Sequence, residues 1–430
     1  MLRLAALLLA TAALPAAAAP TPPERKVVAA VDADQPRALA LLERLVNQNS
    51  GTMNLPGVTK VGEMLRAELE PLGFAVVWKP MAATKRAGHL IATRAGKAGS
   101  KRLLLIGHLD TVFEADNPFQ TYQRTGDTAE GPGVGDDKGG MVVMLTALRA
   151  MRAAGTLDDA SFEIVLTGDE ERTGDPVDTA RADLVAAGKR ADAALDFEGL
   201  VRQDGRDMGS IARRSSNSWQ LTTTGTTGHS SLIFDAKHGD GAINELARIL
   251  AAFRTQLPEK NLTFNTGLIV GGATASFDAD AVRGQATGKP NIIPATAIAR
   301  GDFRTLSDDQ TARVRAKMEA IVAAHAPGTD AKILFDEGYP PMAPTAGNRA
   351  LLAALNGVNR DLGLPAMPEL DPLKRGAGDI AFVAKDVDGL AGLGPYSTGD
   401  HAPGETVDIP SIATQAKRAA LLMARLGGGK

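Results

Sequence analysis

The sequence reads Gly107-His108-Leu109-Asp110-Thr111 directly after the apolar run 103–106, and this stretch decides the fold. An apolar run this short is typical of a buried strand. Because side chains alternate along a strand, His108 and Asp110 would project to the same side at its end. Ligands of open α/β sheets gather at the carboxyl ends of the strands. The stretch therefore predicts an imidazole and a carboxylate side by side where a ligand would bind.

Further acidic clusters follow along the chain. The glycine-rich loop 131–140 contains two adjacent aspartates and precedes an apolar helical pattern. Glu170 and Glu171 follow the strand-like run 162–166, and Glu198 lies at the end of the next such run. Carboxylate and imidazole groups are the usual protein ligands of divalent metal ions. Three acidic clusters at strand ends, one of them with a histidine, therefore predict a metal site.

The composition limits the class of protein and the kind of metal site. A chain of 430 residues favours two domains, and 44% hydrophobic with 23% charged residues is typical of a soluble globular protein. A net charge of −3 gives no electrostatic reason to expect binding to nucleic acid or to anionic lipid. The chain has no cysteine, which excludes disulfides and thiolate zinc sites. Histidine, aspartate and glutamate remain as ligands, and they suit zinc, manganese or cobalt.

The N-terminus predicts a secretory signal peptide over residues 1–18, because Arg3 precedes an apolar run too short to span a bilayer. Residues 19–33 are predicted as a proline-containing linker that ends where Asp34 and Pro36 could begin a helix. Signal removal would leave no membrane segment and would place the protein in the periplasm, which suits a chain without cysteine. A retained N-terminal anchor is the alternative.

Two kinds of pattern divide the rest of the chain. Strand-like runs alternate with helical patterns in residues 34–211 and again in 339–430, which predicts an α/β catalytic domain with a mixed sheet covered on both faces. The segment 212–338 has the order β-α-β-β-α-β, which matches the ferredoxin-like motif. The sequence therefore predicts a catalytic domain into which an α+β unit is inserted.

The chemistry of a dinuclear metal site suggests roles for the clustered residues. Such a site needs a bridging carboxylate, and Asp136 in its glycine-rich loop is the best candidate. His108 is a candidate terminal ligand, and Asp110 could hydrogen-bond its other ring nitrogen. The adjacent carboxylates of Glu170 and Glu171 allow one to bind metal while the other moves a proton.

Two further residues could complete the metal shells, namely Glu198 at its strand end and His401 in a loop with acidic neighbours. Each cluster alone could be an ordinary surface ion pair or a solvated acidic turn, and only their combination favours metal. The glycines of loop 131–135 give a weak signal for nucleotide binding. Their spacing is not G-x-G-x-x-G, and no P-loop Lys-Ser/Thr pair follows.

Several motifs together resemble the zinc-dependent exopeptidases of the ArgE/DapE/aminoacylase/glutamate carboxypeptidase family, with the glutamate carboxypeptidase branch the most similar. The motifs cover nearly the whole chain after the predicted signal: GHLDTV (107–112), GPGVGDDKGG (131–140), TGDEE (167–171), DFEG (196–199), TGHSS (227–231), NIIPA (291–295) and GDHAPGE (399–405). The resemblance implies a zinc-exopeptidase catalytic domain with an inserted ferredoxin-like domain that serves as lid and dimerisation domain.

The resemblance also implies a ligand set for two divalent metal ions, most simply Zn²⁺, with Co²⁺ or Mn²⁺ as alternatives. His108 and Glu198 would bind one ion, Glu171 and His401 the other, and Asp136 both. Two further residues are implied to assist the metal ligands. Asp110 would support His108, and Glu170 would be the general base that activates water. The bond between Asp136 and Asp137 is cis in many relatives.

Lid residues are implied to take part as well. His229 and Asn291 match lid residues that enter the active site of the partner in a homodimer, and Arg304 lies in the Asp-x-Arg motif of the lid. Gly378 lies in the loop 375–379, which stands in place of the family's Gly-Gly-Thr-Asp loop. His229 is therefore a predicted catalytic residue, and Asn291, Arg304 and Gly378 are predicted substrate contacts.

The predicted function is hydrolysis of an amide or peptide bond next to a free C-terminal carboxylate, as in a metallo-carboxypeptidase. An N-acyl-amino-acid deacylase or a dipeptidase of the same family is the alternative, and a periplasmic binding protein is a competitor from another class. The substrate would be a small peptide or an N-acyl amino acid. The arginine turn of glutamate carboxypeptidase is replaced by a segment with Glu337 and Tyr339, which predicts a preference for neutral or apolar residues over glutamate.

Overall fold

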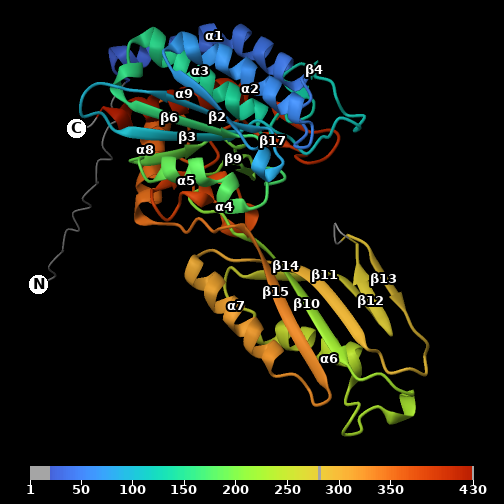
Figure 1. The fold of residues 1–430 in the computed structure, drawn as a ribbon. Coiled ribbons are helices and arrows are strands. Elements are labelled where there is room, and N and C mark those ends of the chain that lie inside the picture. Colours follow the sequence, from blue (N-terminus) through green and yellow to red (C-terminus); the bar gives the residue numbers. More distant parts are fainter. Residues whose placement is uncertain (1–19, 279–281, 429–430) are drawn as a thin grey trace, which may run out of the picture.

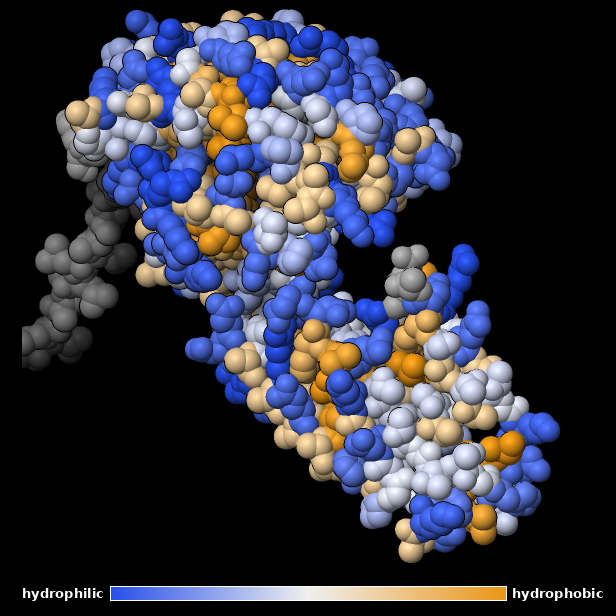
Figure 2. Space-filling view, in the orientation of Figure 1, coloured by the Kyte–Doolittle hydropathy of each residue, from blue (hydrophilic) through white to orange (hydrophobic). Residues whose placement is uncertain are grey.

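The computed structural model describes residues 20–278 and 282–428 of the chain. It has two units, a broad upper unit with helices packed on a sheet and an elongated lower unit that projects from it (Figure 1). Figure 2 shows an open recess between the two units on one side of the molecule. The predicted signal peptide, residues 1–18, lies outside the described residues. None of the helices in the described ranges is long and apolar enough to cross a membrane.

The upper unit is built on a six-stranded mixed sheet. Its strands, in spatial order, are β1 (Ala75–Pro80), β2 (Gly88–Arg94), β6 (Ser161–Thr167), β3 (Arg102–His108), β7 (Ala193–Asp196) and β16 (Gly389–Leu390). The pairs β1–β2 and β2–β6 are antiparallel, and β3 pairs in parallel with β6 and β7. The predicted strands of the first catalytic segment are therefore confirmed, and β3 lies inside the sheet.

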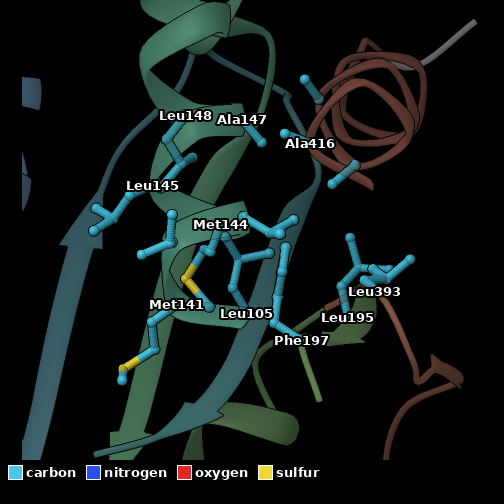
Figure 3. Packing of buried hydrophobic residues seen from close by; sticks show 14 of the residues in the cluster. Leu105, Met141, Met144, Leu145, Ala147, Leu148, Leu195, Phe197, Leu393 and Ala416 are labelled. Carbon is cyan, nitrogen blue, oxygen red and sulfur yellow. The ribbon is translucent and has the colours of Figure 1, made fainter. Parts of the chain in front are cut away.

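Both faces of this sheet are covered, as predicted. One face carries the long helices, which are α1 (Pro22–Val46), α2 (Leu55–Leu69), α3 (Lys138–Ala154) and α9 (Ile409–Gly427). Successive side chains of β3 point to opposite faces of the sheet. Leu103 and Leu105 pack with these helices, whereas Leu104 and Ile106 belong to a second apolar cluster. Figure 3 shows Leu105 packed against Met144 of α3. The second face carries the short helices α4 (Val177–Ala180) and α5 (Ala182–Gly188).

The prediction of a linker over residues 19–33 is wrong, because α1 begins at Pro22. Its N-cap Thr21 and Glu24 form a reciprocal capping box, which satisfies two backbone N–H groups at the start of the helix. Val27 and Val31, one helical turn apart, are fully buried. The helix does not begin at Pro36, which lies inside it. This apolar spacing outweighs the disruption that an internal proline causes.

The lower unit is the predicted inserted domain. Its elements are β10 (Ser216–Gly225), α6 (Gly241–Gln256), β11 (Thr263–Gly272), β12 (Thr274–Phe277), β13 (Gly284–Thr287), β14 (Thr296–Arg304), α7 (Asp308–Ala323) and β15 (Thr329–Tyr339). Four strands form an antiparallel sheet in the order β11-β14-β10-β15, around a core of its own that includes Trp219 and Phe253. The β-α-β-β-α-β order is as predicted, and the hairpin of β12 and β13 is an addition that was not predicted.

After the inserted unit the chain returns to the upper one. There it forms α8 (Ala346–Asp361), β16 and α9. Three short strands, β18 (Thr406–Asp408), β5 (Thr128–Glu130) and β4 (Gln123–Thr125), pair beside β17 (Ser397–Thr398). The register of Thr406 with Glu130 brings the C-terminal loop 399–405 next to the glycine-rich loop 131–137. Strands β8 (Arg202–Gln203) and β9 (Arg206–Asp207) form a separate hairpin.

Candidate active site and metal centre

The carboxyl ends of three parallel strands meet at one edge of the catalytic sheet. His108 at the end of β3 lies in register with Thr167 at the end of β6, and Ile106 lies in register with Asp196 at the end of β7. The segments that follow these strands carry Asp110, Glu170, Glu171 and Glu198, whereas Asp136 lies on the loop after β5, a strand of another sheet. Local strand propensity and parallel pairing therefore bring the clusters together, as the position of His108 and Asp110 at a strand end suggested.

Four predicted metal ligands converge at this edge. The ring Nε2 of His108 lies 2.9 Å from Oδ1 of Asp136, and Nε2 of His401 lies 3.1 Å from Oδ2 of the same carboxylate. His401 Nε2 is also 3.2 Å from Oε2 of Glu171. Ligand atoms of His108, Asp136 and Glu171 all lie within 4.8 Å of one another. Asp136 thus faces both histidines, one with each oxygen, as a bridging carboxylate must.

Burial and close charges shift the pKa values of these groups in opposite directions. Burial raises the pKa of Glu171 to about 11, and the neighbouring carboxylate of Asp136 adds to the shift. Burial also raises the pKa of Glu170 well above its usual range. For Asp136, burial would raise the pKa, but the hydrogen bonds with His108 and His401 hold it far below the ordinary value. Several buried acids around one point create a demand for positive charge.

The Asp110 side chain contacts four neighbouring groups at once. Its Oδ1 lies 3.4 Å from Nδ1 of His108 and accepts a hydrogen bond from the backbone N–H of Glu170 at 3.0 Å. Its Oδ2 accepts from the N–H of Glu171 at 3.2 Å and from the Thr52 hydroxyl at 2.6 Å. The ring Nδ1 also contacts the Asp110 backbone carbonyl oxygen at 3.1 Å. Asp110 therefore fixes the ring of His108 and the start of the Glu170 loop relative to each other.

Glu405, which was not predicted, supports the loop that carries Asp136. Its Oε1 accepts hydrogen bonds from the backbone N–H groups of Gly135 at 2.7 Å and Asp136 at 3.0 Å, and its Oε2 accepts from Gly133 at 3.0 Å. The side chain is buried, and Gly133 has a φ of 72°, which favours glycine. The peptide bond between Asp136 and Asp137 is cis, as the resemblance implied.

Comparison with known proteins identifies the family. The model of the peptidase family M20/M25/M40 matches residues 104–425. This chain belongs to that family. Carboxypeptidase G2 of Pseudomonas sp. (strain RS-16) is 29% identical over 92% of this chain and 91% of its own length. Succinyl-diaminopimelate desuccinylase of Variovorax paradoxus (strain S110) is 26% identical over 88% of this chain and 95% of its own.

Solved structures agree with the M20 assignment of the fold. The aminopeptidase PepT of Bacillus cereus ATCC 10987 superposes with a TM-score of 0.70 at 19% identity, covering 91% of this chain and 98% of its own. A dinuclear metal-binding M20 peptidase of Bacillus subtilis superposes with a TM-score of 0.62 at 15% identity, covering 92% and 99%. The predicted mixed-sheet catalytic domain with an inserted domain is confirmed as the M20 fold, and the chain is a metallopeptidase-type hydrolase, not a binding protein.

The residues of this M20 chain fit a metal ion. Glu171 Oε1 is buried and has no hydrogen-bond partner among the described residues. His108, Asp136 and Glu171 offer nitrogen and oxygen ligands within 4.8 Å of one another, His401 lies beside the two carboxylates, and no thiolate is present in the sequence. This set suits Zn²⁺, Co²⁺ or Mn²⁺. A possible metal site is therefore present, and the identity of the metal stays a prediction.

Glu198 is set apart from the other predicted ligands. Its Oε2 accepts hydrogen bonds from Arg213 at 2.7 Å and from Arg375 at 3.0 Å. Arg213 is buried and also bonds to Asp196 at 3.3 Å. Glu198 lies outside the group of ligand atoms within 4.8 Å, so its role as a metal ligand stays a prediction. The two guanidinium groups neutralise this carboxylate in the absence of a cation.

The predicted lid residues fall in two places. His229 is on the loop that follows β10, and Asn291 is on the segment between β13 and β14; the two lie together, since Ser230 N–H donates to the Asn291 carbonyl at 3.0 Å. The loop after β10 is far from the catalytic sheet (Figure 1). Arg304 and Gly378 lie near the connection between the units, where Gly378 packs against the guanidinium group of Arg213. One chain therefore does not bring His229 to its own metal ligands.

Two residues expected to face the substrate are engaged elsewhere. Glu337 is exposed and pairs with Arg315 of α7 at 2.8 Å. The ring of Tyr339 packs against Phe382 with a centroid distance of 4.9 Å. Its hydroxyl donates to the backbone carbonyl of Glu170 at 2.7 Å. The ring and the hydroxyl of Tyr339 are thus engaged within the protein, and the preference for neutral or apolar residues over glutamate stays a prediction.

Proposed function

We propose that this chain is a co-catalytic metallo-carboxypeptidase, similar to glutamate carboxypeptidase, that cleaves an amide bond next to a free carboxylate. The proposed metal ligands are His108, Asp136, Glu171, Glu198 and His401. The observation that carries the proposal is the convergence of imidazole and carboxylate groups on one point beside Glu170. Similarity to a carboxypeptidase over most of both chains supports the reaction class.

The residues of the chain divide the work of hydrolysis. Bound divalent metal ions, most simply two Zn²⁺, would supply Lewis-acid polarisation of the scissile carbonyl and lower the pKa of water. Glu170 is the proposed general base and acid, since of the adjacent pair it leaves Glu171 to bind metal, and burial raises its pKa above the ordinary value. Asp110 keeps the Glu170 loop and the ring of His108 in fixed relative positions.

Substrate recognition is proposed to need the lid and a second subunit. His229 and Asn291 lie away from the metal ligands of their own chain, so a homodimer through the inserted domain would let them reach the partner's site. Arg304 and Gly378 lie beside the arginines that contact Glu198, where a carboxylate could be bound. Arginine is the usual partner of a buried carboxylate because its fork binds both oxygens.

An N-acyl-amino-acid deacylase or dipeptidase is the second candidate function. Similarity to a desuccinylase over most of both chains favours it, because that enzyme also belongs among the relatives. Both candidate activities would use the same active site. They would be distinguished by the chemical groups that the enzyme accepts on the nitrogen side and on the carbonyl side of the scissile amide bond. We further propose that the mature protein is periplasmic, on the basis of the N-terminal sequence 1–18.

A hydrolysis screen tests the proposed function. Protein stripped of metal by prolonged chelation is reconstituted with zinc, cobalt or manganese and assayed on N-acyl amino acids and dipeptides, each as the free acid and as the amide. Hydrolysis that depends on metal and on the free carboxylate supports the carboxypeptidase proposal. Full activity of rigorously metal-free protein would reject it, and equal rates on the amides would remove the carboxylate receptor.

A further inference from the structure

Tyr339 lies at the point where the inserted unit returns to the catalytic unit. It is the last residue of β15 and pairs with Ser216 at the start of β10, so both connections between the units pass beside it. Its hydroxyl donates to the Glu170 carbonyl at 2.7 Å. The same hydroxyl accepts from Arg181 at 2.9 Å and from Thr173 at 3.1 Å. All hydrogen-bonding capacity of this phenol is therefore used inside the protein.

The backbone of Glu170 is held from both sides. Its N–H donates to Asp110, the residue that orients His108, and its carbonyl accepts from Tyr339. One contact ties Glu170 to the strand end of β3 in the catalytic sheet, and the other ties it to the last strand of the inserted unit. The side chain of Glu170 starts from a peptide segment whose position depends on both units.

A buried ionic cluster holds the phenol in place. The guanidinium group of Arg181 is 1% exposed and bonds to Asp169 at 2.6 Å and to Asp379 at 2.8 Å. It also lies 5.7 Å from the ring centroid of Tyr339 and 5.3 Å from that of Phe382. Burying a charged triad costs desolvation free energy unless its charges pair and hydrogen-bond to one another, as they do here. This cluster fixes the position of the Tyr339 hydroxyl beside Glu170.

We propose that Tyr339 is a positioning residue: held by Arg181, it fixes the backbone of Glu170 relative to the last lid strand, so that the orientation of the general base depends on the position of the lid. The proposal rests on the proposed role of Glu170 as general base. It adds that this role is controlled from the inserted unit through one hydroxyl group, which belongs to a residue far from the metal ligands along the sequence.

The test replaces the hydroxyl and keeps the ring. Tyr339→Phe should keep the metal content of the wild type and its KM, and should lower kcat about tenfold, because misplacing a reacting group is costly without changing binding. Tyr396→Phe is the matched control, since Tyr396 also has an arginine over its ring, Arg202 at 4.2 Å, and none of the hydrogen bonds among the described residues involves its hydroxyl. The control should keep the wild-type kcat.

A double-mutant cycle shows whether Tyr339 acts through Glu170. Glu170→Asp shortens the proposed base, and adding Tyr339→Phe to it should lower kcat much less than tenfold, since the two changes affect one function. Fully additive losses would overturn the proposal, because Tyr339 would then act independently of Glu170. Equal kcat values for Tyr339→Phe and the wild type would also overturn it.

Hydrogen exchange gives a readout that does not depend on activity. In Tyr339→Phe, backbone amides of residues 169–173 should exchange faster than in the wild type, whereas unchanged exchange there would overturn the proposal. Should Tyr339→Phe fail to fold, Phe382→Leu removes the ring that packs on Tyr339 and should give a smaller kcat loss with the same faster exchange. Wild-type activity in Glu170→Gln would reject the proposed base itself, while the exchange result would still report on the contact.

Discussion

Replacing Glu405 tests whether a carboxylate that does not bind metal determines metal affinity. The side chain accepts three backbone N–H bonds at 2.7–3.0 Å from the loop that presents Asp136. Glu405→Gln keeps one carbonyl oxygen and turns the other oxygen into an amide N–H₂ group. If the remaining oxygen keeps Gly135 and Asp136, the N–H of Gly133 loses its acceptor and faces another donor.

The expected magnitude follows from that single unsatisfied group. A buried donor left without an acceptor costs about 1–3 kcal/mol. Each 1.4 kcal/mol corresponds to about a tenfold change in an equilibrium constant. Changes behind metal ligands typically weaken metal binding about 10–100-fold. Glu405→Gln should therefore weaken metal binding by about one to two orders of magnitude, while kcat at saturating metal should remain near that of the wild type.

The assay is competition with a chelator of known affinity, read by calorimetry and by the rise of Tm with added metal. Glu245→Gln is the control, because Glu245 is a buried carboxylate of α6 in the inserted unit that accepts from the N–H of Ala326 at 3.2 Å. It should lower stability without changing metal affinity. Wild-type affinity in Glu405→Gln, or an equal loss in the control, would refute the reasoning.

Three further outcomes are expected. Glu170→Gln should keep its metal and lose roughly 10²–10⁴-fold in kcat, whereas Glu171→Gln should lose metal content. Elemental analysis of both variants, together with kcat, checks this prediction. The opposite result would mean that the roles of Glu170 and Glu171 are exchanged. Mixing inactive Glu170→Gln with inactive His229→Ala should restore part of the activity if subunits exchange, and a fully active His229→Ala monomer would contradict this. Burial raises the pKa values of Asp196 and Glu405 to about 7, so metal-free protein should lose stability as pH rises from about 5.5 to 8, by about 2 kcal/mol per group in urea unfolding. Constant or rising stability over that range would show that these carboxyls are not protonated in the folded state.

Local patterns in the sequence predict the catalytic sheet and the metal centre. The apolar run before His108 predicts β3, and Asp110 lies beside the His108 ring as expected, although the strand itself ends at His108. The clusters at 169–171 and 196–198 follow strands whose parallel pairing brings their ends together. Each of these inferences uses residues a few positions apart and a rule of sheet geometry, which is why they hold without any knowledge of the three-dimensional structure.

Contacts between distant segments could not be predicted in the same way. Glu405 is 272 positions from Gly133, and Tyr339 is 169 positions from Glu170. No periodicity links such pairs, because the inserted unit separates them along the chain. The first helix is a different case, since the capping pair of Thr21 and Glu24 is visible in the sequence. In that case the proline-rich composition led to the incorrect prediction of a linker over residues 19–33.

The two kinds of contact have different physical roles at one site. Asp136, Glu170 and Glu171 bring buried negative charge to one point, and Asp137 is fully buried beside them with its pKa raised by that burial. Such a group of acids destabilises the folded state unless protons or cations neutralise it. The local pattern supplies the charged ligands, and distant segments hold the loops that carry them. Glu405 accepts hydrogen bonds from three backbone N–H groups of the Asp136 loop, and the Tyr339 hydroxyl donates to the carbonyl of Glu170. Metal binding should therefore stabilise the catalytic unit most where these distant segments meet it, which links metal affinity to the packing of the C-terminal loop rather than to the ligands alone.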